Sequence, residues 1–184
     1  MNKWIKLMAI AGVSASILAG CGNGNNNGAN EAASPSPAAE QTDANSSASI
    51  VNEADAFIHA VSAEGTWIVA ITSDVTVDQD VVISGEFHDK GAAENAVYRK
   101  LALYAQDAEH NITDSYTLTA PKVTVQSENQ LVQGGTIKGD VVVEANGFTL
   151  DKTATIDGNL TFASAEAQDS ATLDGTVTGE TAVQ

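Results

Sequence analysis

Histidines and aspartates are the side chains of this sequence whose spacing could bind a metal ion. His88 is followed directly by Asp89, and His110 follows Glu109, both in segments expected to be loops. No His-x-x-x-His spacing joins them, so a metal site is not expected. Three aspartates share one face of an expected strand: Asp74, Asp78 and Asp80. Calcium loops alternate acids with glycines, and that pattern is absent. The sequence therefore predicts no metal and no other cofactor.

Paired carboxylates are the second arrangement that could do chemistry, because glycoside hydrolysis places two of them across a sugar. The candidate acids are Asp140 with Asp157 or Asp174. Arg99 or Lys100 could act as the base of a lyase. Only 5% of the residues are aromatic, which leaves few rings to stack on sugars. We therefore do not expect an enzyme.

The single cysteine, Cys21, is informative because of the segment that precedes it. That segment has the three parts of a secretory signal: a positive start at Lys3 and Lys6, an apolar run over 7–18, and the small pair Ala19-Gly20. The fourteen residues from 7 to 20 are too few to span a hydrocarbon core of about 30 Å. Residues 1–20 are predicted to be a signal peptide.

The tetrad Leu18-Ala19-Gly20-Cys21 resembles the lipobox of bacterial lipoproteins. The resemblance implies diacylation of the Cys21 thiol, cleavage between Gly20 and Cys21, and acylation of the new amino terminus. Two or three acyl chains anchor a protein stably, since each buried methylene contributes about 0.8 kcal/mol. The expected location is the cell membrane, with the chain lipid-anchored on the extracytoplasmic face.

Composition separates a tether from a folded domain. Residues 21–48 contain no aromatic and no large aliphatic side chain, which predicts a disordered tether. Residues 49–184 are expected to form one domain. The chain has 8 basic and 24 acidic residues and a formal charge of −16, which becomes −18 when the two lysines of the signal are removed. Such a surface repels nucleic acid, so no nucleic-acid partner is expected.

Three octapeptides align without gaps and predict a repeat. They are TIKGDVVV from 136, TIDGNLTF from 155 and TLDGTVTG from 172. Weaker matches begin at 76, 96 and 117, the last with one bulged residue near Pro121. Starts 19 and 17 residues apart leave no room for a helical repeat and suit one coil of a β-solenoid. Apolar residues at alternate positions indicate strands with one buried face.

Stacked coils place equivalent octapeptide positions about 4.8 Å apart, which predicts columns of side chains. Two inward ladders are expected, one of Ile137, Ile156 and Leu173 and one of Val141, Leu160 and Val177. A glycine column at a bend is expected to hold Gly139, Gly158 and Gly175. An outward column is expected to hold Lys138, Asp157 and Asp174, which form a candidate interaction surface.

A helix over 52–64 is predicted to cover the N-terminal end of the coils. Asn52 is the expected cap, Asp55 lies three residues on, and Gly65 marks the end. Residues 67–71 read as the first strand, with Trp67 packed in the core. This helix would cover the exposed strand edges of the first coil. The C-terminal coil has no comparable cover and is where self-association could occur.

The stretches 139–143 and 156–162 resemble the rungs of bactofilin-type, polymer-forming β-helix proteins, over residues 117–179. The resemblance implies a right-handed β-helix, no cofactor and end-to-end assembly, which a lid on one end would limit to capped dimers. The expected fold is all-β: a short, single-stranded, right-handed parallel β-helix of about six coils with an N-terminal capping α-helix.

A non-catalytic structural or interaction domain in the cell envelope is the expected function. The alternative is a module that binds carbohydrate or a cell-wall polymer, and a polysaccharide-active enzyme is less favoured. The expected partners are the membrane, through the lipid on Cys21, and an envelope protein or wall polysaccharide.

Overall fold

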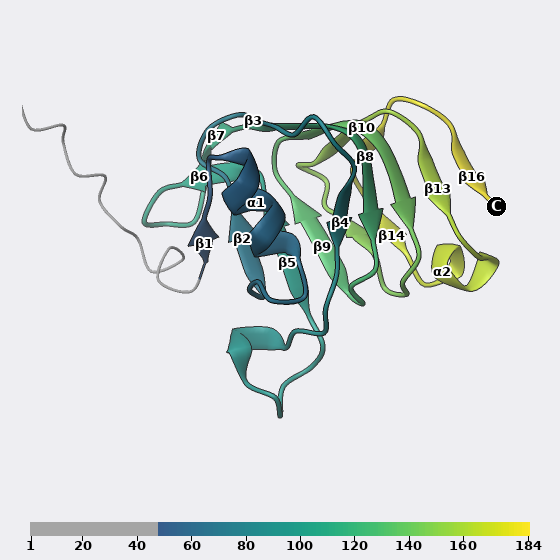
Figure 1. Ribbon diagram of the computed structural model, residues 1–184, viewed down its shortest axis with the longest axis horizontal. Helices are drawn as coiled ribbons and strands as arrows, with labels where there is room; N and C mark the ends of the chain where they lie inside the picture. Colours follow the sequence, from purple (N-terminus) through teal and green to yellow (C-terminus); the bar gives the residue numbers. More distant parts are fainter. Residues whose placement is uncertain (1–47) are drawn as a thin grey trace, which may run out of the picture. The chain divides into compact units, whose positions relative to one another are not determined.

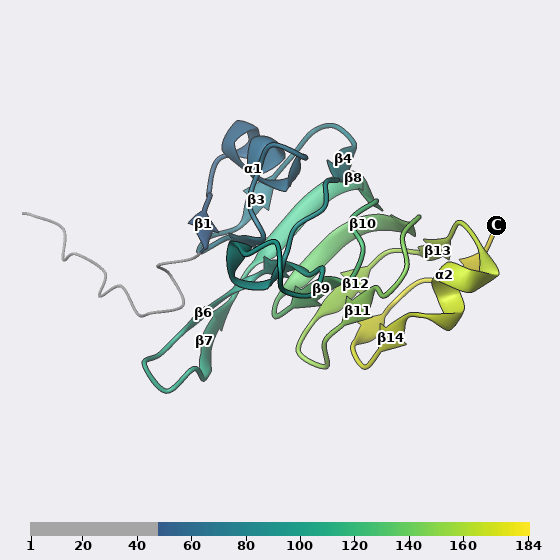
Figure 2. The ribbon, with the colours of Figure 1, turned by 90° about the horizontal axis from the view of Figure 1, so that it is seen from below.

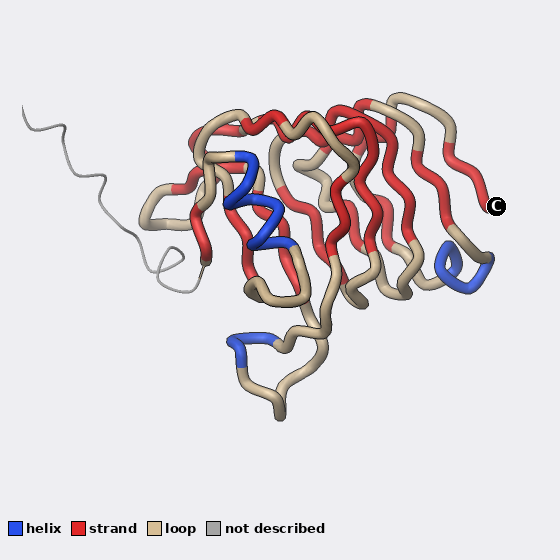
Figure 3. Tube along the Cα trace, viewed as in Figure 1, coloured by secondary structure: helices blue, strands red, loops and turns tan. Residues whose placement is uncertain are grey.

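The structure is a computed structural model that describes residues 48–184. The predicted signal peptide 1–20, the lipidation site Cys21 and all but the last residue of the predicted tether 21–48 lie outside the described residues. Within 48–184 the chain winds through short strands, and most strands pair in parallel with the strand one turn later (Figure 1). Strand dominates over helix (Figure 3). The predicted all-β fold, a parallel β-helix with an N-terminal helix, is confirmed.

Sheet A forms one face of the coils and contains one strand from each. Its six strands, in spatial order, are β1 (Ser49–Ile50), β2 (Ile68–Ala70), β5 (Arg99–Ala102), β9 (Gln130–Gln133), β11 (Thr149–Leu150) and β14 (Thr172–Leu173). Spatial order equals sequence order, as in a solenoid whose coils contact only their neighbours.

Sheet B covers the other two faces, which meet at a bend. Its eight strands are β3 (Val75–Thr76), β4 (Val81–Ile83), β8 (Thr117–Val125), β10 (Thr136–Val143), β12 (Thr155–Asp157), β13 (Leu160–Phe162), β15 (Thr176–Val177) and β16 (Thr181–Val183). β8 and β10 run through the bend, whereas the other coils break there into two strands. Lys138 pairs with Thr119, but Asp140 pairs with Lys122. The predicted bulge near Pro121 is therefore confirmed.

A column of glycines lets adjacent coils approach at this bend. A Cβ on Gly139, whose φ is 141°, would lie 1.9 Å from the Ala120 carbonyl oxygen. A Cβ on Gly158 would lie 2.2 Å from the Gly139 oxygen, and one on Gly179 would lie 2.5 Å from the Gly158 oxygen. Any side chain here would force the coils apart. The column therefore ends at Gly179, and the prediction of Gly175 was wrong.

Ladders of apolar side chains fill the interior. One ladder in sheet B contains Val75, Leu118, Ile137, Ile156 and Val177. Another contains Ile83, Val125, Val143, Phe162 and Val183, and that of sheet A contains Val69, Leu101, Val132, Leu150 and Leu173. Most of these side chains are fully buried. Each such burial stabilises the fold by about 1.5–3 kcal/mol before chain entropy is counted.

The octapeptide that begins at Thr172 occupies a different face from the one predicted. Thr172 pairs with Thr149 in sheet A, and the partner of Thr155 is Thr176. Leu173 therefore stacks on Leu150 instead of Ile156. The short helix α2 (Ala165–Asp169) precedes β14 and lengthens this coil, so the spacing of 17 residues did not mark a full turn.

Two upstream octapeptides were also misplaced. The match at 96 falls on β5 in sheet A, whereas the matches at 76, 117, 136 and 155 lie in sheet B. Thr76 pairs with Thr119 instead of Thr117. The loop 84–98 and the antiparallel hairpin of β6 (Tyr104–Gln106) and β7 (Ile112–Ser115) are inserted here and obscure the period. Figure 2 shows the hairpin projecting away from the coils.

Helix α1 (Ala54–Val61) lies within the predicted range 52–64 and buries Phe57, Ala60 and Val61 against the first coil. Asn52 is not its cap: the N-cap is Glu53, which makes no side-chain cap bond. The Asn52 carboxamide instead accepts the Thr72 N–H at 2.8 Å and donates to the Thr72 hydroxyl at 2.9 Å. Asn52 therefore fixes the entry to the helix against the first coil.

Candidate functional site

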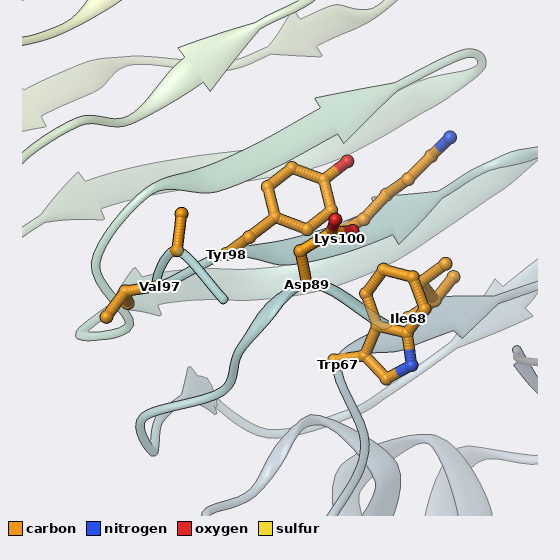
Figure 4. A pocket seen from close by; sticks show the side chains of 7 residues that line it. Trp67, Ile68, Asp89, Val97, Tyr98 and Lys100 are labelled. Atoms are coloured by element: carbon orange, nitrogen blue, oxygen red, sulfur yellow. The ribbon is translucent and has the colours of Figure 1, made fainter. Parts of the chain in front are cut away.

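A shallow pocket of about 450 Å³ opens on the outward face of sheet A, between β2 and β5. It is lined by the rings of Trp67 and Tyr98, the Asp89 and Lys100 side chains, and Ile68 beside Trp67 (Figure 4). Outward placement follows from strand alternation, because Val69 and Leu101 point inward and their neighbours Ile68 and Lys100 point outward. The pocket combines apolar surface with one acid and one base.

The rings of Trp67 and Tyr98 come from consecutive coils and are inclined to each other. Their centroids are 6.0 Å apart and their planes are inclined at 56°. The Lys100 N–H donates to the Trp67 carbonyl oxygen at 2.8 Å, so sheet pairing fixes the backbone between the rings. Trp67 is partly exposed and is absent from the buried core. The prediction that Trp67 packs in the core was wrong.

The loop 84–98 brings Asp89 to the pocket. The Asp89 N–H donates to the Ala96 carbonyl oxygen at 3.0 Å, and the Asn95 side chain donates to the Asp89 carbonyl at 2.8 Å. The single turn η2 (Asp89–Gly91) follows, with Lys90 at φ 58°. These bonds hold the loop folded back on itself and fix the backbone of Asp89 beside the pocket.

Arg99 joins this loop, helix α1 and the sheet. Its guanidinium donates to the carbonyl oxygens of Ala60 at 2.9 Å, Ser62 at 3.1 Å and Ser84, and lies 4.2 Å from the centre of the Phe87 ring. The side chain is 1% exposed. Burial lowers the pKa of Arg99 to about 10, so it stays charged at neutral pH. The suggestion that Arg99 is a catalytic base is not supported by this placement.

The protonation of Tyr98 and the hydrogen bonds of Lys100 determine which polar groups the pocket presents. Burial, and secondarily the charges of Tyr104 and Asp89, raise the pKa of Tyr98 to about 12, so its hydroxyl stays protonated. The Lys100 amine donates to the Tyr104 hydroxyl at 2.8 Å, and that hydroxyl donates to the Gln133 side chain at 3.1 Å. Figure 4 shows this amine directed away from Trp67. Lys100 therefore presents mainly its aliphatic part to the Trp67 side of the pocket.

Only two of the three residues predicted for the outward column, Lys138, Asp157 and Asp174, lie in one column. Lys138 and Asp157 are register partners on β10 and β12, and both are exposed. The next position along the column is Thr178, whose hydroxyl donates to the Asp157 carboxylate at 3.0 Å. Asp174 follows β14 instead, so its placement in this column was wrong.

The aspartates considered for sugar chemistry tie coils together. One carboxylate oxygen of Asp140 accepts the backbone and side-chain N–H groups of Asn159, at 2.9 and 3.0 Å. Asn159 in turn accepts the Glu180 N–H at 3.0 Å. Asp74 accepts the Thr117 N–H at 2.7 Å in the same way. These side chains satisfy backbone donors of neighbouring coils.

The residues considered for metal binding lie apart. Across residues 48–184, no group of three or more His, Cys, Asp or Glu side chains is placed to hold a metal ion. Asp80 forms an ion pair with Lys122 at 2.7 Å. The ring of His88 lies 2.8 Å from the Asn95 carbonyl oxygen. Glu109 and the exposed His110 lie in the turn of the projecting hairpin.

Comparison with protein-family models, with curated proteins and with solved structures found no match to this chain. The bactofilin and lipobox resemblances therefore stay predictions. No helix among residues 48–184 is long and apolar enough to cross a membrane.

Sequence reasoning missed the pocket because Trp67 and Tyr98 are 31 residues apart, far from the repeat interval. Tyr98 and Lys100 could have been placed on one outward strand face by their spacing of two. Their pairing with Trp67 depends on the stacking of two coils across the inserted loop 84–98.

Proposed function

We propose that this chain is an extracytoplasmic lipoprotein, anchored by lipid on Cys21, whose β-helix is a non-catalytic interaction module of the cell envelope. The anchor is supported by the sequence of residues 1–21 alone. The module is supported by the pocket of Trp67 and Tyr98, because rigid parallel strands present it outward with fixed geometry. This pocket is the observation that carries the proposal.

Binding of a wall polysaccharide is the favoured form of this function. Aromatic rings on an outward sheet face, flanked by an acid and a base, suit a ligand with both apolar and hydrogen-bonding surfaces. A polysaccharide-active enzyme is less favoured, since Asp140 and Asp157 are engaged in bonds between coils.

Association with a protein, including a second copy, is the other candidate. Leu173 and Val183 on the last described coil are each 39% exposed, although they continue buried ladders. The β14, β15 and β16 strands pair on one side only within residues 48–184. Such strand edges and apolar side chains are surfaces on which another chain can pair.

The proposal is tested by replacing Cys21 in the full chain and growing the cells with labelled palmitate. We expect the parent and a Ser46→Ala control to carry the label and Cys21→Ser to carry none. Purified Cys21→Ser protein should then be retained on isolated cell envelopes. Its sedimentation with and without envelope fragments separates polymer binding from self-association. Labelling of Cys21→Ser equal to that of the parent would contradict the anchor, and no retention on envelopes would contradict the interaction module.

A further inference from the structure

The pocket on sheet A offers an incoming ligand two different kinds of surface. Trp67 and Tyr98 provide ring faces, and Ile68 adds apolar surface. Asp89 provides a hydrogen-bond acceptor, and the protonated Tyr98 hydroxyl provides a donor. No protein partner to the Asp89 carboxylate or to the Tyr98 hydroxyl was found within residues 48–184, so both groups are available. A ligand that matches these walls is amphipathic, with one apolar face and hydroxyl groups at its edge.

The charges around the pocket select against anionic ligands. An anionic ligand meets Asp89 in the pocket and a formal charge of −16 on the whole chain. The Lys100 amine is bonded to the Tyr104 hydroxyl and directed away from Trp67, so it contributes mainly its aliphatic part. An acceptor on Asp89 beside a donor on Tyr98 favours a neutral ligand whose hydroxyl groups can both donate and accept hydrogen bonds.

The pocket is also preorganised. The rings stand on adjacent coils joined by the bond from the Lys100 N–H to the Trp67 carbonyl oxygen, and Arg99 anchors the loop that carries Asp89. Little side-chain and loop entropy is then lost when a ligand binds.

We propose that this pocket binds a neutral pyranose unit of an uncharged polysaccharide, with the sugar ring against Trp67 and its hydroxyl groups bonded to Tyr98 and Asp89. The inference rests on the proposed interaction module and names its ligand. Anionic wall polymers are excluded as ligands of this pocket. No covalent step is involved.

Fluorescence of Trp67 reports on this pocket directly. The sequence has two tryptophans, and Trp4→Phe leaves Trp67 as the only one. The full chain carrying Trp4→Phe, in a detergent without a sugar headgroup, is titrated with cellotetraose, chitotetraose, anionic tetragalacturonate and tetramethylammonium chloride. We expect a saturable change of Trp67 emission with at least one of the two neutral tetrasaccharides, and none with the two ionic probes.

Variants connect the signal to the proposed contacts. Tyr98→Ala and Asp89→Asn should each weaken binding of the neutral tetrasaccharide by about tenfold. Val82→Ala, at an exposed position of sheet B, should bind as the parent does. No response to either neutral tetrasaccharide, equal binding of an ionic probe, or unchanged binding by both pocket variants would overturn the inference. If Tyr98→Ala is still retained on isolated envelopes, the interaction module stands and only this assignment of its ligand fails.

Discussion

At the scale of single residues, Arg99 has the largest structural role that sequence reasoning did not foresee. A buried guanidinium without a carboxylate partner is unusual, and this one is satisfied by backbone carbonyls near the end of α1 and the start of the loop 84–98. Arg99 occupies an inward-facing position of β5, where a polar side chain without hydrogen-bond partners would destabilise the fold. One residue thus joins the N-terminal helix to the coil that carries Tyr98.

Replacing Arg99 by Met tests this role. The apolar stem is kept, but the carbonyl groups of Ala60, Ser62 and Ser84 lose their donor, so we expect the free energy of unfolding to fall by about 3 kcal/mol. Urea unfolding followed by circular dichroism gives this value. Lys100→Met, at the outward neighbour, should change it by less than about 1 kcal/mol. An equal effect of the two substitutions would contradict the role of Arg99.

Ionisation of Tyr98 should oppose folding at alkaline pH. Its pKa is raised from 10.0 to about 12 in the folded chain, chiefly by burial. The folded state therefore holds this proton more tightly than the unfolded state does. The corresponding stabilisation is complete below pH 10 and is lost as the pH rises from 10 toward 12. Burial also raises the pKa of Tyr116, so the comparison is made in a chain that carries Tyr116→Phe. Tyrosinate absorbance of Tyr116→Phe should show a late titration step that disappears when Tyr98→Phe is added. A late step that survives in the double variant would be against this assignment.

At the scale of elements, the glycine bend decides how closely the coils of sheet B stack. A Cβ added to Gly158 would lie 2.2 Å from the Gly139 carbonyl oxygen of the preceding coil. We expect Gly158→Ala to destabilise the fold by about 3 kcal/mol, because the backbone of two coils must separate. Thermal unfolding of the variant measures this loss.

Gly91→Ala is the matched control for Gly158→Ala. Gly91 has φ +68°, but its nearest neighbour to an added Cβ is 3.9 Å away, so only a conformational cost of about 1 kcal/mol remains. If Gly91→Ala were the more damaging of the two, close packing at the bend would not be the reason for the glycine column.

At the scale of the whole molecule, the inserted segments lie in the N-terminal coils and the regular coils follow them. The coils from β9 onward follow one another closely, whereas the loop 84–98 and the β6–β7 hairpin interrupt the earlier ones. The pocket lies among these insertions, between β2 and β5, and not at the C-terminal coil where sequence reasoning expected self-association. Regular coils thus provide the repeating frame, and the irregular ones carry the surface that we propose binds a ligand.

The sequence by itself determined the fold class and much of its interior. Alternating apolar residues in 136–143 and 155–162 mark buried strand faces, and their offset of 19 residues equals the register between Thr136 and Thr155. The bulge near Pro121 and the N-terminal helix were also predicted correctly. These features depend on local pattern and on a constant spacing, and both are visible along one chain.

Only the tertiary structure decided which face each strand occupies where the spacing changes, and which side chains meet across coils. Leu173 and Val177 changed ladders because α2 lengthened one turn, and Asp174 left the column of Asp157 for the same reason. Trp67 and Tyr98 meet because parallel pairing aligns β2 with β5 across an inserted loop. The register between coils is fixed by the packing of whole ladders of side chains. Because this packing joins residues that are far apart in the chain, no short motif predicts it.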